Sequence, residues 1–157
     1  LSDEQPHIRD SGGGLQQALR YFSDDAVFTL NSDNVWTGQN PLAALAKAWQ
    51  PEKMDALMVL QPVDRATGRE GSGDLGLDTD GRICFGTAEK PYVFTGAQLI
   101  KTAPIAAVEA AIFGLREVWE GLAQSGRLYG VVHKGGWADV GHPEGIIAAE
   151  TLLKASA

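Results

Sequence analysis

The chain has 157 residues, of which 44% are hydrophobic and 21% charged, which is typical of one globular domain rather than of a disordered segment. A formal net charge of −7 argues against a protein that wraps duplex nucleic acid, because such a protein needs a basic surface to displace counterions. No apolar run approaches the ~18 residues needed to cross a membrane, and the basic residues are scattered. The single cysteine rules out a disulfide framework, and we expect a cytoplasmic protein.

The first half of the chain predicts two strands with a helix between them. We expect a helix over residues 14–22, a buried strand over Ala26–Leu30 and a second buried strand over residues 54–60. Between the strands, Asn40-Pro41 predicts a helix start, since Asn caps free N–H groups and Pro fits the first helical position. Strand, helix and strand in this order predict a βαβ unit with parallel strands.

The second half predicts a hairpin, further strands and three helices. Apolar alternation on both sides of Asp80-Gly81 predicts a hairpin with a tight turn. Periodicity then predicts, in chain order, a strand over 92–100, helices over 104–113 and 115–124, a strand over 128–133 and a helix from His142-Pro143 to about Ala155. The fold class is therefore α/β, with a mixed sheet flanked by helices.

Two aspartates follow predicted strands and are candidates for a metal site. Asp33 stands just after the first strand in Asn31-Ser32-Asp33-Asn34, and Asp139 stands a few residues after the last strand. Ligands of α/β sheets collect beyond the carboxyl ends of strands, and Mg²⁺ accepts one or two protein carboxylates with water and phosphate oxygens. The alternative for Asp33 is a plain turn, because Asn, Ser and Asp bond their own backbone there.

Three segments, in this order, resemble the sugar-1-phosphate nucleotidyltransferases: "DSGGGLQQAL", "FTLNSDNVW" and "GRLYGVVHKGGWADVGHPEGIIAAE". The resemblance is strongest to the short bacterial group related to N-acetylmuramate-1-phosphate uridylyltransferase and mannose-1-phosphate guanylyltransferase. It extends over nearly all 157 residues. It implies a Rossmann-like, glycosyltransferase-A type fold, and a reaction of a nucleoside triphosphate with a sugar 1-phosphate that gives a nucleotide sugar and pyrophosphate.

The resemblance also implies roles for particular residues. Asp33 and Asp139 would be the catalytic, magnesium-binding aspartates, and Asn31 would lie beside the sugar or the phosphates. A loop near the nucleotide base would be formed by Gly12, Gly13 and Gly14, whose bare backbone lets a flat ring approach closely. The sugar pocket would be lined by Gly73, Asp74, Thr95 and Gly96.

The chain departs from the family pattern in one large respect. The family opens, within about its first 75 residues, with a Gly-x-Gly-x-Arg loop that grips the triphosphate through backbone N–H groups, and nothing here matches it. We therefore expect residues 1–157 to be the C-terminal two-thirds of a single nucleotidyltransferase domain, incomplete at the N-terminus and inactive alone. Central strands of the sheet would then lack a partner. Smaller departures are Asp10-Ser11, Gly114, Arg116 and His142.

The favoured activity is uridylyl transfer to N-acetylmuramate 1-phosphate, with UTP or GTP as the nucleotide, Mg²⁺ as cofactor, and neither nucleic acid nor membrane as partner. The alternative is a non-catalytic relative that binds nucleotide sugars, or an inactive fragment. A glycosyltransferase of related fold ranks last, because it would prefer an Asp-x-Asp metal motif and residues 31–34 offer a single aspartate.

Overall fold

The structure is a computed structural model and describes residues 2–69, 71–86, 89 and 91–156. The helices are α1 (Asp10–Ala18), α2 (Pro41–Ala48), α3 (Thr102–Ala106), α4 (Leu115–Gln124) and α5 (Pro143–Ala155), with 3₁₀ turns at Leu19–Tyr21 and Val63–Arg65. The strands are β1 (Ala26–Leu30), β2 (Asn34–Trp36), β3 (Ala56–Pro62), β4 (Ala66–Thr67), β5 (Leu75–Leu77), β6 (Ile83–Phe85), β7 (Tyr92–Lys101), β8 (Leu128–Val132) and β9 (Trp137–Asp139).

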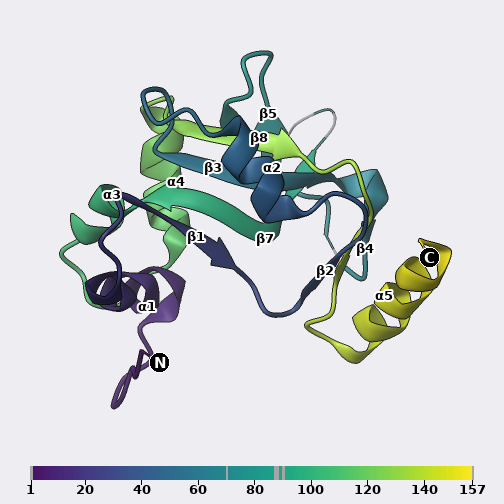
Figure 1. Ribbon diagram of the computed structural model, residues 1–157, viewed down its shortest axis with the longest axis horizontal. Coiled ribbons are helices and arrows are strands. Elements are labelled where there is room, and N and C mark those ends of the chain that lie inside the picture. Colours follow the sequence, from purple (N-terminus) through teal and green to yellow (C-terminus); the bar gives the residue numbers. More distant parts are fainter. Residues whose placement is uncertain (1, 70, 87–88, 90, 157) are drawn as a thin grey trace.

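A mixed six-stranded sheet forms the centre of the molecule (Figure 1). Its order is β6-β5-β7-β3-β8, and β1 pairs with β7 alongside this path. β3 runs parallel to β8, whereas β7 is antiparallel to β1, β3 and β5. The predicted α/β class with a mixed sheet is confirmed.

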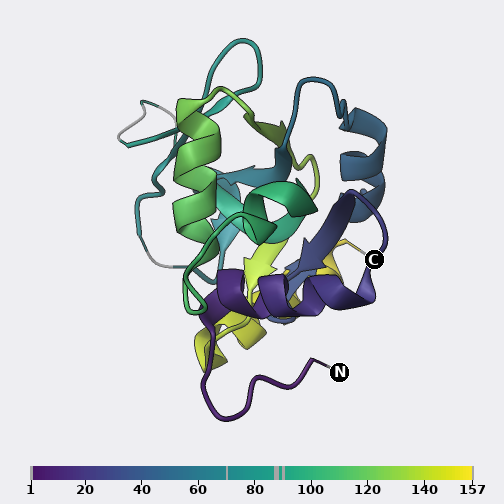
Figure 2. The same cartoon turned by 90° about the vertical axis from the view of Figure 1, so that its left-hand side faces the viewer.

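Helices cover both faces of this sheet, and the alternation of β3 shows why (Figure 2). Met58 and Leu60 point into a core that also contains buried residues of α3 and α4 and is flanked by Leu15 and Leu19. Leu57 and Val59 point to the opposite face, where they meet Leu45 of α2. Because side chains of a strand alternate between faces, a fully buried strand such as β3 needs a cover on each side.

A second, three-stranded sheet was not predicted from the sequence. β9 lies between β2, to which it is antiparallel, and β4, to which it is parallel. Asp139 therefore ends a strand of its own, β9, and does not follow the predicted strand β8 directly. The three strands have only two or three residues each, too short to show a period in the sequence.

Three other sequence predictions need correction. The strands β1 and β3 do not pair as a βαβ unit, because β7 lies between them and pairs with both. β1 is not a buried strand, since only Val27 is buried. The helix predicted over 104–113 ends at Ala106, because the backbone of Phe113 bonds instead to Arg9, Gly12 and Gly13.

The triple glycine is helical rather than a loop. Gly12, Gly13 and Gly14 lie in the first half of α1, and the positive φ angle belongs to Asp10, at 62°. The N–H groups of Gly12 and Gly13, which a helix start leaves unpaired, donate to the carbonyl of Phe113 at 3.0 and 3.1 Å. A Cβ at position 12 would lie 2.3 Å from the Phe113 ring, so close packing, not a turn, requires glycine there.

None of the helices within the described ranges combines the length and hydropathy that crossing a bilayer requires. The other predicted elements, namely the hairpin at Asp80-Gly81, the strand over 92–100, and the helices that start at Pro41, Leu115 and Pro143, are confirmed with bounds within about two residues.

Candidate functional site

Asp33 and Asp139, 106 positions apart in the sequence, come together in the structure. The pairing of β2 with β9 sets Asn34 opposite Asp139, and the N–H of Val140 donates to the carbonyl of Asp33 at 2.8 Å. A Cβ placed on Gly141 would lie 3.1 Å from Asp139 Oδ1 and 3.4 Å from Asp33 Oδ2. Both carboxylates thus border the same point in space.

Two asparagines and a glycine complete this group. The N–H of Asn31 donates to the carbonyl of Gly96 at 2.9 Å, and Asn34 Nδ2 donates to Asp33 Oδ1 at 2.9 Å. Gly96 has a φ of +84°, and a Cβ there would lie 2.8 Å from side-chain atoms of both asparagines. Only glycine allows the end of β1 and the start of β2 to lie this close to β7. Asn34 was not singled out in the sequence, and its only signal was its place beside Asp33.

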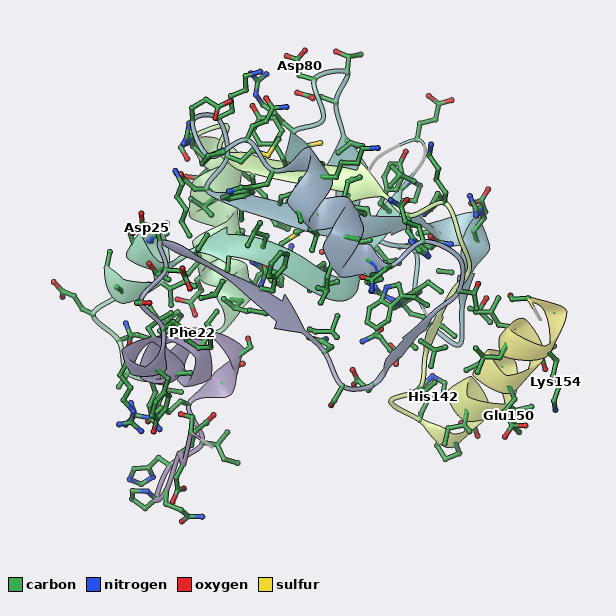
Figure 3. The ribbon with its side chains drawn as sticks, in the orientation of Figure 1. Phe22, Asp25, Asp80, His142, Glu150 and Lys154 are labelled. Carbon is green, nitrogen blue, oxygen red and sulfur yellow. The ribbon has the colours of Figure 1, made fainter. Side chains whose placement is uncertain are left out.

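A pocket of about 580 Å³ opens beside Asp139 and is lined also by Arg69, His142 and Glu144. His142 caps α5, whose start it marks in Figure 3, and Nδ1 accepts from the N–H of Gly145 at 3.3 Å. Its Nε2 lies 2.6 Å from the carbonyl of Gly68, and Glu144 lies 3.2 Å from Nδ1. The Gly68 carbonyl, and then Glu144, raise the pKa of His142 above its ordinary value. The backbone near Asp139 is thereby held in place.

The carboxylate pair fits a hard divalent cation. Asp33 Oδ2 and Asp139 Oδ1 face a common point on the exposed side of Gly141, and two carboxylates are the protein contribution that Mg²⁺ commonly takes. Across the described parts of the chain, no three His, Cys, Asp or Glu side chains gather closely enough to hold a metal by themselves. A cation here would therefore draw its remaining ligands from water or from phosphate oxygens.

The triple glycine lies at a different place, against the start of α4. Ser11 Oγ accepts from the N–H of Leu115 at 3.1 Å, and Gly12 and Gly13 bond to Phe113. Arg116, one position further along α4, forms an ion pair with Asp74. The segments around Gly12–Gly14 and Gly73-Asp74 are therefore joined through the first turn of α4.

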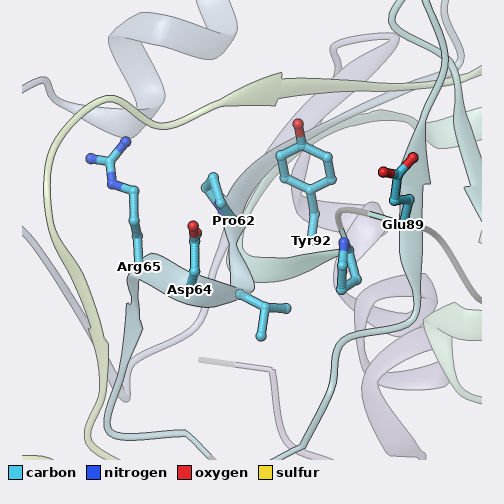
Figure 4. A pocket seen from close by; sticks show the side chains of 7 residues that line it. Pro62, Asp64, Arg65, Glu89 and Tyr92 are labelled. Atoms are coloured by element: carbon cyan, nitrogen blue, oxygen red, sulfur yellow. The ribbon is translucent and has the colours of Figure 1, made fainter.

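The predicted sugar-pocket residues divide into two groups. Gly73 has a φ of +72° and packs against Val63 and Tyr92, which line a pocket of about 510 Å³ together with Pro62, Asp64, Arg65, Glu89 and Pro91 (Figure 4). Thr95 is fully buried, its hydroxyl donates to the carbonyl of Val59 at 2.9 Å, and its carbonyl accepts from Trp137 Nε1 at 3.1 Å. The side chain of Thr95 thus holds β7 to β3 and β9, whereas Gly96 lies beside the aspartates.

The site residues named from the sequence therefore form two clusters. Asn31, Asp33, Gly96 and Asp139 gather at the small sheet, and the triple glycine with Gly73 and Asp74 gathers at the start of α4. The roles of these residues in binding stay predictions, and they enter the proposal below.

Comparisons with solved structures define the class of fold. No protein-family model matches the chain. HddC from Yersinia pseudotuberculosis, in complex with GMP-PN, superposes with a TM-score of 0.70 at 17% identity over 94% of this chain and 64% of that chain. The inositol-1-phosphate CTP transferase from T. maritima gives 0.66 at 13% identity over 95% and 64%, and a UDP-glucose pyrophosphorylase complexed with UDP-glucose gives 0.68 at 12% over 96% and 64%. The predicted glycosyltransferase-A type, Rossmann-like fold is confirmed.

A curated relative is more similar in sequence. The chain is 34% identical over 157 residues to N-acetylmuramate alpha-1-phosphate uridylyltransferase of Caulobacter vibrioides. The match covers 98% of this chain and 65% of that protein, so the chain spans about two thirds of the relative's length. The resemblance to the sugar-1-phosphate nucleotidyltransferases that the three sequence segments indicated is confirmed.

Proposed function

We propose that this chain forms the metal-binding and sugar-phosphate-binding part of a sugar-1-phosphate nucleotidyltransferase. In the reaction, a phosphate oxygen of the sugar 1-phosphate attacks the α-phosphorus of a nucleoside triphosphate, the bond to the β-phosphate breaks and pyrophosphate leaves. The favoured substrates are UTP and N-acetylmuramate 1-phosphate, because the curated relative at 34% identity is named for that reaction.

The observation that carries this proposal is the convergence of Asp33 and Asp139 on one point beside an open pocket. Chain position does not bring them together, and neither side chain has an ion-pair partner among the residues that the structure describes. Two adjacent carboxylates repel each other, so an arrangement that keeps them close is favourable when a cation lies between them.

In this proposal Asp33 and Asp139 hold Mg²⁺, which when bound neutralises charge on the transferred phosphate. The attacking phosphate is already anionic, so no side chain has to act as a base. Asn31 and Asn34, held by Gly96 and Asp33, offer amide groups beside the phosphates. The triple glycine of α1 contributes to the base site, and Gly73 with Asp74 contributes to the sugar pocket.

Substitution of the aspartates tests the metal site directly. We expect Asp33→Asn and Asp139→Asn each to weaken binding of Mn²⁺, a paramagnetic substitute for Mg²⁺, by at least about tenfold, because each removes one of two anionic ligands. Electron paramagnetic resonance of free Mn²⁺ measures this on the 157-residue chain. Asp80→Asn, in the exposed hairpin turn, is the matched control and should bind as the parent chain does. Unchanged Mn²⁺ affinity in both variants would refute the site.

Turnover tests the reaction and the substrate. In the full-length protein we expect magnesium-dependent pyrophosphate release with UTP and N-acetylmuramate 1-phosphate, and its loss in either aspartate variant. Parallel assays with GTP and mannose 1-phosphate should give a lower kcat/KM. A preference for GTP would overturn the substrate assignment. Tight binding of nucleotide sugars without any turnover would favour the non-catalytic alternative.

A further inference from the structure

One edge of the main sheet is open along its whole length. β1 pairs with β7, and none of the printed pairings of the described strands gives it a second neighbour. The N–H of Thr102 donates to the carbonyl of Asp25, and the N–H of Asn31 donates to the carbonyl of Gly96. Odd-numbered residues of this segment therefore bond toward β7. Because an antiparallel strand alternates its bonding direction, Ala26, Phe28 and Leu30 direct their N–H and C=O groups away from the sheet.

The side chains along this edge are apolar and exposed. Phe28 is 46% and Leu30 51% exposed, and Phe22, which precedes the strand, is 51% exposed. Phe22, Val27 and Phe28 line a surface pocket of about 490 Å³. Figure 3 shows Phe22 and Asp25 at the start of β1, whose outer side carries no further strand or helix in the two ribbon views (Figures 1 and 2).

These residues extend a core layer that stops uncovered. Phe28 pairs with Leu99 and Leu30 with Ala97, and both partners belong to the core under α2. Paired residues of neighbouring strands point to the same face, so Phe28 and Leu30 continue this apolar layer past α2. Proteins normally protect an exposed sheet edge with charge, proline or a covering segment, yet β1 contains none of these.

We propose that the open edge of β1 binds one further β-strand by main-chain hydrogen bonds. This strand belongs to the part of the nucleotidyltransferase polypeptide that the present sequence does not match. Apolar side chains of that strand and of the segment following it would cover Phe28 and Leu30. The curated relative has about a third of its length outside the match, and the similar structures have as much. That length is ample for a strand of about five residues and a helix.

A second copy of this chain fits the edge less well. Antiparallel pairing of two β1 strands centred on Phe28 would set Asp24 and Asp25 of one copy against residues 31–32 of the other, next to Asp33. Like charges across a strand pair are destabilising, and each copy carries a net charge of −7. The acidic ends of β1 therefore favour a partner strand of different sequence.

Complementation tests this proposal by binding rather than by activity, so its result is separate from that of the catalytic proposal. The 157-residue chain is mixed with a polypeptide made of the Caulobacter residues outside the match, and mass is measured by light scattering. We expect a complex with one copy of each component, and slower amide hydrogen exchange over residues 26–30. A homodimer of this chain whose β1 amides are protected, or a monomer that ignores the added polypeptide, would overturn the proposal.

Two substitutions on β1 locate the contact. Phe28→Pro removes an outward N–H and should weaken the complex at least about tenfold while the fold persists, because edge strands tolerate proline there. Phe28→Lys keeps every N–H group and should weaken it by adding charge to the uncovered layer. Thr29→Pro removes an N–H that faces β7 and should instead destabilise the chain itself. Full binding by folded Phe28→Pro and Phe28→Lys would place the contact elsewhere.

Discussion

At the scale of single residues, Asp55 is the most strongly coupled acid in the chain. It lies just before β3, and its carboxylate accepts from Arg127 Nε at 3.1 Å and Nη2 at 2.9 Å, and from Lys101 Nζ at 2.7 Å. The side chain is 22% exposed, so solvent only partly screens these contacts. Hydrogen bonds from Arg127, and then from Lys101, lower the pKa of Asp55 from 3.8 to about 2. Three segments distant in sequence, 51–55, 101 and 127, are tied together here.

This lowered pKa predicts a pH-dependent loss of stability on acidification. The group contributes stability above its unfolded pKa, and this contribution disappears as the pH falls through the folded value, between about pH 4 and pH 2. Near neutral pH, Asp55→Asn should lower the free energy of unfolding by about 2 kcal/mol, and the difference from the parent chain should vanish in acid. Urea denaturation at a series of pH values measures both. Asp80→Asn is the control, because its ion pair with Arg82 is exposed and should be worth less than about 1 kcal/mol. A difference that persists unchanged to the lowest pH would show that Asp55 does not act through its charge.

At the scale of elements, α2 shows how one local signal determines a helix. Asn40 Oδ1 accepts from the N–H groups of Leu42 at 2.9 Å and Ala43 at 3.2 Å, and Pro41 occupies the first helical position. Leu45, on the same helix, is fully buried against the sheet. The cap therefore fixes where the helix begins, and the apolar face fixes which way it turns.

Loss of this cap should be measurable without damage to the fold. Asn40→Ala leaves two N–H groups of α2 without their side-chain acceptor and should lower the free energy of unfolding by about 1 kcal/mol. Asn40→Asp keeps the acceptor and should restore nearly all of that stability. Chemical denaturation monitored by circular dichroism makes the comparison. Equal stability of the alanine and aspartate variants would mean that the cap does not limit the stability of α2.

At the scale of the whole molecule, Trp137 joins the small sheet to the large one. It lies on β9, is 1% exposed, and its Nε1 donates to the carbonyl of Thr95 on β7 at 3.1 Å. Asp139 is two residues further along the same strand, and Gly96 adjoins Thr95. The position of one aspartate relative to the other therefore depends on contact between the two sheets.

Removal of this single donor should loosen the connection between the sheets. Trp137→Phe leaves the buried carbonyl of Thr95 unpaired and should cost about 1–3 kcal/mol of unfolding free energy. Mn²⁺ affinity should fall as well, because Asp139 would no longer be held at a fixed distance from Asp33. Trp49→Phe, at a partly exposed position after α2, is the matched control and should change neither quantity by a comparable amount. Loss of stability with unchanged Mn²⁺ affinity would show that the connection does not position the metal site.

The sequence by itself determined the elements whose signals are local. Asn40-Pro41, His142-Pro143 and Asp80-Gly81 mark boundaries through caps and turn geometry, and the structure places them there. The three quoted segments likewise carry the family resemblance without any contact between them. Asp33 and Asp139 could be named as candidates for the same reason, because residue type and order suffice for a resemblance.

Only the tertiary structure decided which segments meet. The insertion of β7 between β1 and β3, the short strands β2, β4 and β9, and the early end of α3 all depend on partners far away in the chain. Long-range pairing and burial leave no period in two or three residues, and they override local propensity where a backbone such as that of Phe113 finds a better partner. The same reason applies to the site: the carboxylates are local facts, but their common point beside Gly141 exists only once β2 pairs with β9.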